Sequence, residues 1–296
     1  MNALEQGFLL LTSYLGDPER RPLTVAQFRK LANLARTMEK PTQERELTVE
    51  DLQILGCDAV FARRVVNLLS QEDHLNRYVK RGKQNGCVPI TRLSVQYPGR
   101  LRKVLGLDAP GTLWLKGNPD ILGTTTVSVV GSRELNPKNT AFAEAIGRLA
   151  ALQGYTLVSG NARGADRTAQ DSCLKNGGKV ISVVADELAS HRVRENVLYI
   201  SEEGFDLAFS ATRALQRNRI IHSLSDKTFV VQCSLKKGGT WNGTDNNLRH
   251  NWSQVICFDD GSDASRELGS MGVTLTTLEA LKDIASIQPT DMSFLP

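Results

Sequence analysis

Hydrophobic and polar positions follow two different patterns along the chain. Over residues 1–85, apolar residues recur three and four positions apart, as at Val25, Phe28 and Leu31, with Thr24 as the expected N-cap of that run. Later in the chain, short apolar runs alternate with amphipathic stretches. We expect strands at the apolar runs, which lie at residues 127–130, 156–158, 180–184, 197–200, 228–231 and 255–258. Continuous apolar strands separated by helices are typical of a parallel sheet with helices on both faces. The pattern therefore predicts a doubly wound α/β fold with a mostly parallel sheet, preceded by a small all-helical domain.

The boundary between the two regions is placed where the composition changes and strand and turn residues begin. We therefore divide the chain into a helical domain over residues 1–85 and a larger α/β domain over residues 86–296. In the first, a Leu-Gly-Cys turn at residues 55–57 precedes Arg63 and Arg64. This is weakly similar to a SAM-like or helix-hairpin-helix nucleic-acid module. A plain helical domain is the interpretation we favour, because one glycine turn is a weak signal.

Composition and charge exclude several classes of protein. The 296 residues include 36 basic and 32 acidic side chains, a net charge of +4, which allows a polyanionic partner without requiring one. The five cysteines form no C-x-x-C pair and the four histidines are scattered, so we expect no metal, no disulfide framework and no cofactor. The chain has no long apolar run, and its N-terminus lacks the basic segment of a secretory signal. We expect a cytoplasmic protein that does not enter the membrane.

Small polar loops, each with a basic residue, follow three of the predicted strands. They are Gly131-Ser132-Arg133, Ser159-Gly160-Asn161-Ala162-Arg163-Gly164-Ala165-Asp166 and Lys236-Lys237-Gly238-Gly239-Thr240. Glycine lets a phosphate approach backbone amides, and the helix that follows directs its positive end there. One such loop would mean little, but three with cations at one sheet edge favour a phosphate-binding pocket. Neither G-x-G-x-x-G nor G-x-x-x-x-G-K-[ST] is present, which argues against a dinucleotide-binding fingerprint and a P-loop NTPase.

The densest basic cluster lies in the helix predicted over residues 212–223. Arg213 and Arg217 at its start are four positions apart and share a helical face. No acidic residue lies between Asp206 and Asp226 to neutralise the cluster. Because arginine binds phosphate oxygens through a bidentate fork, the cluster favours a polyphosphate backbone as the ligand.

Several motifs, in this order and spacing, resemble those of the DprA/Smf family of DNA-processing proteins. They are Tyr97-Pro98-x-x-Leu101, Pro110-x-x-Leu113-x-x-Lys116-Gly117, Gly131-Ser132-Arg133, Ser159-Gly160-x-Ala162-Arg163-Gly164-x-Asp166, Gly177-Gly178 and Arg217-Asn218-Arg219-Ile220-Ile221. The resemblance covers about residues 85–285 and implies an extended Rossmann-like domain. It also implies a non-enzymatic homodimer that binds single-stranded DNA and helps to load a RecA-type recombinase, in DNA uptake (natural transformation) or recombination.

The loop chemistry and the resemblance together suggest a set of candidate residues. For binding nucleic acid or phosphate they are Gly131, Ser132, Arg133, Ser159, Gly160, Arg163, Gly164, Arg213, Arg217, Asn218, Arg219, Lys236, Lys237, Gly238, Gly239 and Thr240. Asp166 and Glu202 are expected to orient loops and arginines, and no catalytic residue is assigned.

The chain departs from the family pattern at the same site. Ala214-Leu215 stands where the family usually has Phe-Pro, so an aromatic stacking platform is missing there. Trp241 is a candidate to replace that ring, and a core or surface position for Trp241 is equally open. Gln170 stands where the family commonly has a histidine.

An alternative function uses the same pocket. It would bind a small nucleotide or hydrolyse a nucleotide N-glycosidic bond, in defence against foreign DNA, with Asp166, Glu202 or Glu203 as the acid. A scaffold that binds only protein is a third hypothesis, and it would leave the three basic loops without a purpose.

Overall fold

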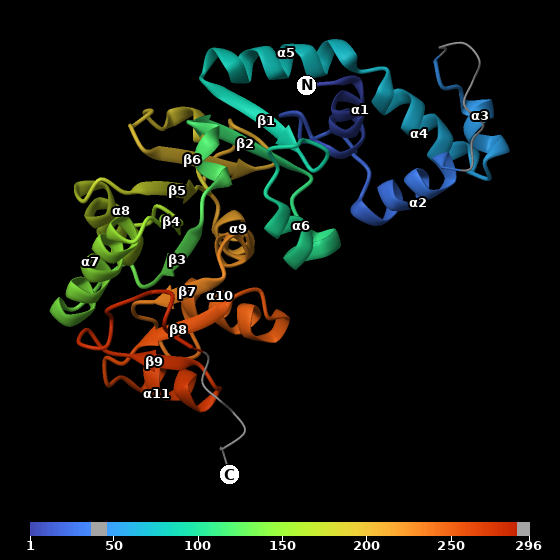
Figure 1. Cartoon of the computed structure of the whole chain (residues 1–296). Helices are drawn as coiled ribbons and strands as arrows, with labels where there is room; N and C mark the ends of the chain where they lie inside the picture. Colours follow the sequence, from blue (N-terminus) through green and yellow to red (C-terminus); the bar gives the residue numbers. More distant parts are fainter. Residues whose placement is uncertain (37–45, 289–296) are drawn as a thin grey trace.

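The computed structural model describes residues 1–36 and 46–288 (Figure 1). In this part of the chain, a nine-stranded sheet has the order β1-β2-β6-β5-β4-β3-β7-β8-β9. Its strands are β1 (Cys87–Thr91), β2 (Thr112–Gly117), β3 (Thr126–Val130), β4 (Thr156–Ser159), β5 (Lys179–Val183), β6 (Val197–Glu202), β7 (Lys227–Val230), β8 (Gln254–Phe258) and β9 (Thr274–Thr276). From β6 across to β9 the strands are parallel, whereas β1 and β2 are antiparallel additions at one edge. The mostly parallel sheet is confirmed, and the three-residue β9 is not among the predicted strands.

Helices cover both faces of the sheet. One face carries α7 (Pro137–Leu152) and α8 (Ala165–Lys175), and the other carries α6 (Gly99–Leu105), α9 (Ala211–Leu224), α10 (Gly238–His250) and α11 (Asp263–Ser270). Short 3-10 helices are η1 (Gly106–Asp108), η2 (Pro119–Gly123) and η3 (Leu188–Ser190). Successive strand residues point to opposite faces, so Val129 lies in the core beneath α7 and Val130 in the core beneath α9. The predicted doubly wound α/β architecture is therefore confirmed.

The N-terminal region is helical, as predicted. Its helices are α1 (Ala3–Thr12), α2 (Val25–Ala35), α3 (Val49–Ile54), α4 (Ala59–Leu69) and α5 (Glu72–Gln84). Thr24 caps α2 through its side chain, and α2, α3 and α4 enclose a small core around Leu31 and Leu52. Helices α1 and α5 also pack on the sheet, where the Tyr78 ring meets Trp114 edge-on with centroids 5.3 Å apart. The predicted domain boundary falls between α5 and β1, and the division into two domains stays a prediction.

The sheet order reverses beside β3, and this reversal creates a crevice at the carboxyl ends of the strands. Strand β3 pairs with β4 on one side and with β7 on the other. The chain leaves β3 through α7 toward β4, but it reaches β7 from β6 through α9. Because β3, β4 and β7 are parallel neighbours, the three basic loops that follow them lie at one edge. Within the described residues, every helix is too short or too polar to cross a bilayer.

Candidate functional site

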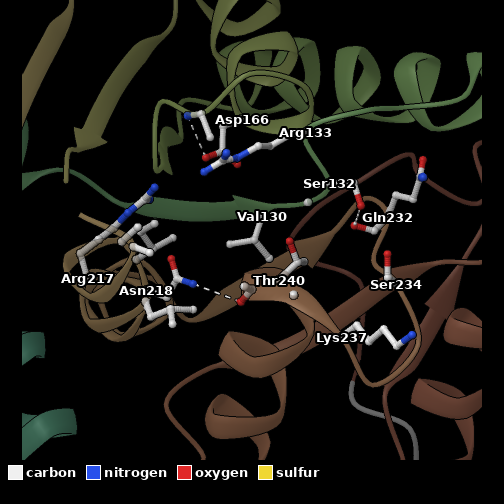
Figure 2. A pocket seen from close by; sticks show the side chains of 18 of the residues that line it. Val130, Ser132, Arg133, Asp166, Arg217, Asn218, Gln232, Ser234, Lys237 and Thr240 are labelled. Carbon is white, nitrogen blue, oxygen red and sulfur yellow. Dashed lines mark hydrogen bonds between the residues drawn. The ribbon is translucent and has the colours of Figure 1, made fainter. Parts of the chain in front are cut away.

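A cavity of about 740 Å³ opens at this reversal point, between the carboxyl ends of β3 and β7 (Figure 2). Its walls come from the loop after β3, from α9, and from the segment that leads from β7 into α10. Its lining includes Gly131, Ser132, Arg133, Asp166, Arg217, Asn218, Lys237, Gly238, Gly239 and Thr240, all of them predicted site residues. The tertiary structure therefore brings most of the predicted residues, from distant parts of the sequence, to one cavity.

Hydrogen bonds and close packing hold the loop after β3 in place without using the side chain of its arginine, Arg133. The N–H and the hydroxyl of Ser132 both donate to the Gln232 carbonyl, at 2.9 and 3.1 Å. Gly131 packs so closely that an added Cβ would lie 2.4 Å from the Ala165 Cβ. The exposed Arg133 side chain lines the cavity and makes no hydrogen bond or ion pair with any described residue. Its donors are available to an anion.

Asp166 organises the loop after β4. Its carboxylate accepts hydrogen bonds from the N–H groups of Gly160 and Ala162, at 3.0 and 3.2 Å. Burial raises the pKa of Asp166, and the positive charge of Arg217 opposes that rise. Gly164 has a φ of +85°, and an added Cβ would lie 2.4 Å from a backbone oxygen of the loop after β3. A glycine at this position lets the loops after β3 and β4 pack directly against each other.

Arg217 is the most constrained cation of the cavity. Its guanidinium lies directly over Gly160, where an added Cβ would be 1.4 Å from Nη1. Its Nε is buried and has no hydrogen-bond partner in the described part of the chain. Burial lowers the pKa of Arg217, and the Asp166 carboxylate opposes that fall. The guanidinium is thus desolvated while retaining donors that an anionic ligand would satisfy.

The N-terminus of α10 forms the third wall. Lys237 directly precedes this helix, and its exposed side chain makes no hydrogen bond or ion pair with the described residues. The Asn218 amide donates to the Gly239 carbonyl at 3.2 Å, which ties α9 to α10 beside the cavity. Because the N–H groups of a first helical turn carry partial positive charge, this wall adds to the attraction for an anion.

A comparison with known families concerns the part of the chain that carries this cavity. The family model for DNA recombination-mediator protein A matches residues 89–271. The chain belongs to this family. Membership confirms the resemblance to DprA/Smf proteins that the motifs indicate. The chain is 30% identical to the DNA processing protein DprA of Streptococcus pneumoniae over 212 residues, which are 66% of this chain and 70% of the relative.

Two solved structures of DprA proteins share the fold. The X-ray structure of DprA from Streptococcus pneumoniae has a TM-score of 0.70 at 24% identity and covers 93% of this chain and 95% of that one. A structure of DprA from Helicobacter pylori, described for its single-stranded DNA binding mode, has a TM-score of 0.54 at 22% identity. It covers 64% of this chain and 90% of that chain. At these identities the likeness establishes a common fold.

Two predicted arginines of α9 are engaged by protein groups instead of facing the cavity. Arg213 donates to the Ala185 carbonyl at 2.7 Å and to carbonyls of the segment before α9. Arg219 forms a two-pronged ion pair with the Glu202 carboxylate. A helix turns about 100° per residue, so Arg219 lies about 200° around the axis from Arg217. Both arginines hold the walls together.

Six further predicted residues lie outside the lining of this cavity, namely Ser159, Gly160, Arg163, Gly164, Glu202 and Lys236. Arg163 is 73% exposed and pairs with Glu134 at 2.8 Å. Lys236 pairs with an acidic residue of α11 at 2.9 Å. The Ser159 hydroxyl is buried and accepts a hydrogen bond from the Gln170 amide at 2.6 Å. Gln170, at the family's usual histidine position, therefore fixes the end of β4.

The structure corrects the suggestion that Trp241 offers a stacking ring. Trp241 is 7% exposed and packs in the core between α10 and the sheet. The exposed aromatic at the cavity is Phe209, which is 57% exposed and directly precedes Ser210, the N-cap of α9. Sequence reasoning missed Phe209, although an aromatic residue directly before the N-cap of a basic helix was a signal for it.

His222 lines the cavity without contributing charge. Its Nδ1 lies 3.0 Å from the Asn247 amide nitrogen, and burial lowers the pKa of His222 to about 3. The imidazole is therefore neutral at physiological pH. Among the described residues, no group of three or more histidine, cysteine or acidic side chains is placed to hold a metal ion.

Proposed function

We propose that this chain binds the phosphate backbone of single-stranded DNA in the cavity between β3 and β7, without enzymatic turnover. One observation carries the proposal. Arg133 and Arg217 line the same cavity, and neither guanidinium is hydrogen-bonded to a described residue. Arginine binds phosphate oxygens through paired N–H donors. A polymer with a phosphate at every nucleotide offers acceptors to both arginines at once.

The neighbouring groups suit a single strand better than a duplex. Phe209 is exposed at the cavity, and aromatic rings bind unpaired bases by stacking. Lys237 and the first turn of α10 add positive charge along the path of the backbone. In a duplex, the bases are already stacked on one another and are not available to an aromatic side chain. We therefore assign phosphate contacts to the cationic walls and a base contact to Phe209.

The other predicted residues take supporting roles in this proposal. Gly131, Gly160 and Gly164 let neighbouring protein groups pack closely, and Gly238 and Gly239 leave room for the DNA backbone. Neutral hydrogen bonds are assigned to Ser132, Asn218 and Thr240. Arg213, Arg219, Glu202, Asp166 and Ser159 hold the walls in place. Arg163 and Lys236 are neutralised by their acidic partners and are assigned no contact with the DNA.

The relatives support a role beside a recombinase. The matching family model is named for recombination mediation, and the Helicobacter pylori relative is described by its single-stranded DNA binding. We infer that the chain acts as a homodimer that helps to load a RecA-type recombinase, in DNA uptake (natural transformation) or recombination. Light scattering of the purified protein tests the dimer. Recombinase loading is tested by the rate at which a purified recombinase assembles on coated single strands, and no acceleration would contradict it.

Fluorescence polarisation with labelled oligo-dT tests the DNA-binding proposal. We expect binding that weakens steeply as salt increases and that a mononucleotide does not displace. Lys237→Gln and Lys236→Gln form a matched pair, because the residues are adjacent and equally charged but Lys237 alone lines the cavity. Only Lys237→Gln should weaken binding. A mononucleotide that raises the melting temperature while oligo-dT fails to bind would favour the nucleotide-ligand alternative and overturn the proposal.

A further inference from the structure

A second cavity, of about 560 Å³, adjoins the first one and shares Arg217 with it. It is open to solvent and is lined by the loops after β3, β4 and β5, by the segment before α9 and by α9 itself. Arg133, Arg217 and Phe209 line this cavity as well as the first one. Glu134 lines both cavities, whereas Asp166 lines only the first and Asp186, on the loop after β5, lines only the second.

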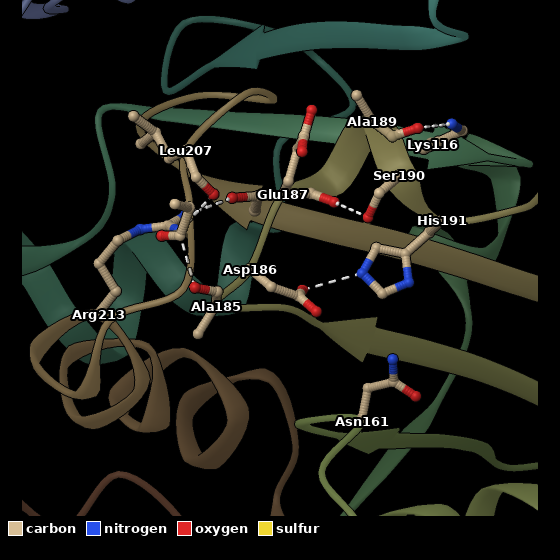
Figure 3. Close-up of polar contacts among 12 residues, drawn as sticks. Lys116, Asn161, Ala185, Asp186, Glu187, Ala189, Ser190, His191, Leu207 and Arg213 are labelled. Atoms are coloured by element: carbon tan, nitrogen blue, oxygen red, sulfur yellow. Dashed lines mark hydrogen bonds and ion pairs between the residues drawn. The ribbon is translucent and has the colours of Figure 1, made fainter.

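The Asp186 carboxylate is held in a fixed orientation (Figure 3). His191 Nε2 lies 2.9 Å from Asp186 Oδ1, and the His191 ring stacks on Tyr199 with centroids 4.8 Å apart and planes inclined at 22°. The hydrogen bond from His191 holds the pKa of Asp186 below its usual range, so the carboxylate is ionised at neutral pH. Asp186 is about half exposed, and a carboxylate has acceptor positions beyond the one that His191 occupies.

The ionised Asp186 carboxylate repels phosphate, so the part of the second cavity beside it suits another group, whereas Arg133, Arg163 and Arg217 line the rest of that cavity. An acceptor-only group suits instead a base edge that donates hydrogen bonds. Unpaired bases are commonly read at their Watson–Crick edges while they stack on an aromatic ring. Phe209 supplies such a ring at the mouth shared by the two cavities, and Arg217 between them is placed to hold the adjoining phosphate.

The four bases differ in how well they match a carboxylate. Guanine presents N1–H and the N2 amino group side by side, which matches the two carboxylate oxygens. Adenine and cytosine each present one amino group, and thymine presents one N–H between two carbonyl oxygens that the carboxylate repels. Asn161, which also lines the cavity, carries an amide that can donate to the guanine O6 (Figure 3). The lining thus offers acceptors and a donor in the pattern that guanine requires.

We propose that the second cavity is a base subsite that prefers guanine, with Asp186 as the reading group and His191 as its positioning residue. The proposal rests on the single-strand binding proposed above. It adds a preference among bases that binding through phosphate alone would not produce.

Three oligonucleotides of equal length test the subsite by competition in fluorescence polarisation. They are oligo-dT, an alternating dG–dT strand and the same strand with deoxyinosine for guanine, all in a lithium buffer that does not support guanine quadruplexes. Wild-type protein should bind the dG–dT strand about tenfold more tightly than oligo-dT, a discrimination typical of a bidentate contact. The deoxyinosine strand lacks the N2 amino group and should lose most of that gain.

The variants separate base reading from charge. Asp186→Asn should abolish the preference for guanine and keep or improve the affinity for oligo-dT. Glu187→Gln is the matched control, because it removes the same charge at the next position, outside the lining of the cavity, and should keep the preference. His191→Phe keeps a ring on Tyr199 but removes the hydrogen bond, and it should reduce the preference.

The outcomes distinguish the two proposals. Equal affinity of the wild-type protein for the three strands, or a preference that survives Asp186→Asn, would overturn the base subsite and leave single-strand binding in place. Failure to bind any of the strands would overturn the proposed function, and the subsite with it.

Discussion

The substitution Gly160→Ala tests whether Arg217 is held in place for a ligand. The new methyl group would lie 1.4 Å from Nη1 and 2.1 Å from Cζ of the Arg217 guanidinium. Non-bonded heavy atoms normally approach to about 3.5 Å, so the guanidinium would have to retreat by about 2 Å. Gly160 does not have a positive φ, so alanine fits its backbone. The substitution therefore acts mainly on the position of the arginine.

The magnitudes follow from the surroundings of that guanidinium. Moving the group into water solvates the buried Arg217 Nε but takes a positive charge away from the buried Asp166 carboxylate, so the free energy of unfolding should fall by about 1 kcal/mol. Loss of one charged hydrogen-bonding contact to phosphate costs about 1.5–3 kcal/mol, or roughly 10- to 150-fold in affinity for single-stranded DNA. The slope of log affinity against log salt should also become shallower by about 0.7.

Polarisation titrations with oligo-dT at several salt concentrations, together with urea unfolding, measure both effects. Gly99→Ala is the matched control, because an added Cβ there has no heavy atom within 4 Å. It should leave both quantities unchanged. Unaltered DNA binding by Gly160→Ala would refute the role of Arg217. A loss of several kcal/mol in stability would show instead that the arginine supports the fold.

Three further changes test other parts of the site. Arg133→Ala should weaken oligo-dT binding and lower the slope of log affinity against log salt by about 0.7. Arg163→Ala removes an equal charge from an ion-paired residue and should change neither quantity. Equal effects of the two variants in a salt titration would contradict a phosphate contact by Arg133. Phe209→Ala should cost about 1–3 kcal/mol of single-strand affinity and Phe209→Tyr should restore it, because stacking requires only the ring; unchanged binding by the alanine variant would exclude stacking. Lowering the pH from 8 to 5 should lower the free energy of unfolding by about 2 kcal/mol through His222. Below pH 6.5 the His222 imidazole binds a proton in the unfolded chain, whereas in the folded chain it stays neutral until about pH 3. Urea titrations should show that loss in the wild type and not in His222→Gln, and identical pH profiles would count against a buried neutral imidazole.

Much of the fold could be predicted because its signals are local. The apolar runs from residue 127 onward mark β3 to β8 in the correct order, and Thr24 marks the start of α2. Parallel strands that are neighbours end at the same edge of a sheet, so the convergence of the basic loops follows from the strand pattern and the order β4-β3-β7. The family motifs lie in these same loops, and the family match confirms the resemblance.

The role of each cation could not be predicted in the same way. Arg213, Arg217 and Arg219 look alike in a basic helical segment, yet Arg219 is neutralised by Glu202 and Arg213 is bound by the Ala185 carbonyl. These partners are 17 and 28 positions away in the sequence, and the sheet brings them to α9. Arg217 alone of the three lines the cavity between β3 and β7.

The role of the aromatic residues and the lining of the second cavity likewise depend on contacts that are distant in the sequence. Trp241 and Phe209 are both aromatic residues near basic loops, and burial alone distinguishes them. Asp186 is positioned by His191, whose ring stacks on Tyr199 of β6. The sequence by itself determined the strands and the helices, because those depend on residues a few positions apart. Only the tertiary structure decided which side chains remain available to a ligand, because that depends on partners that are distant in the chain and leave no periodic signal.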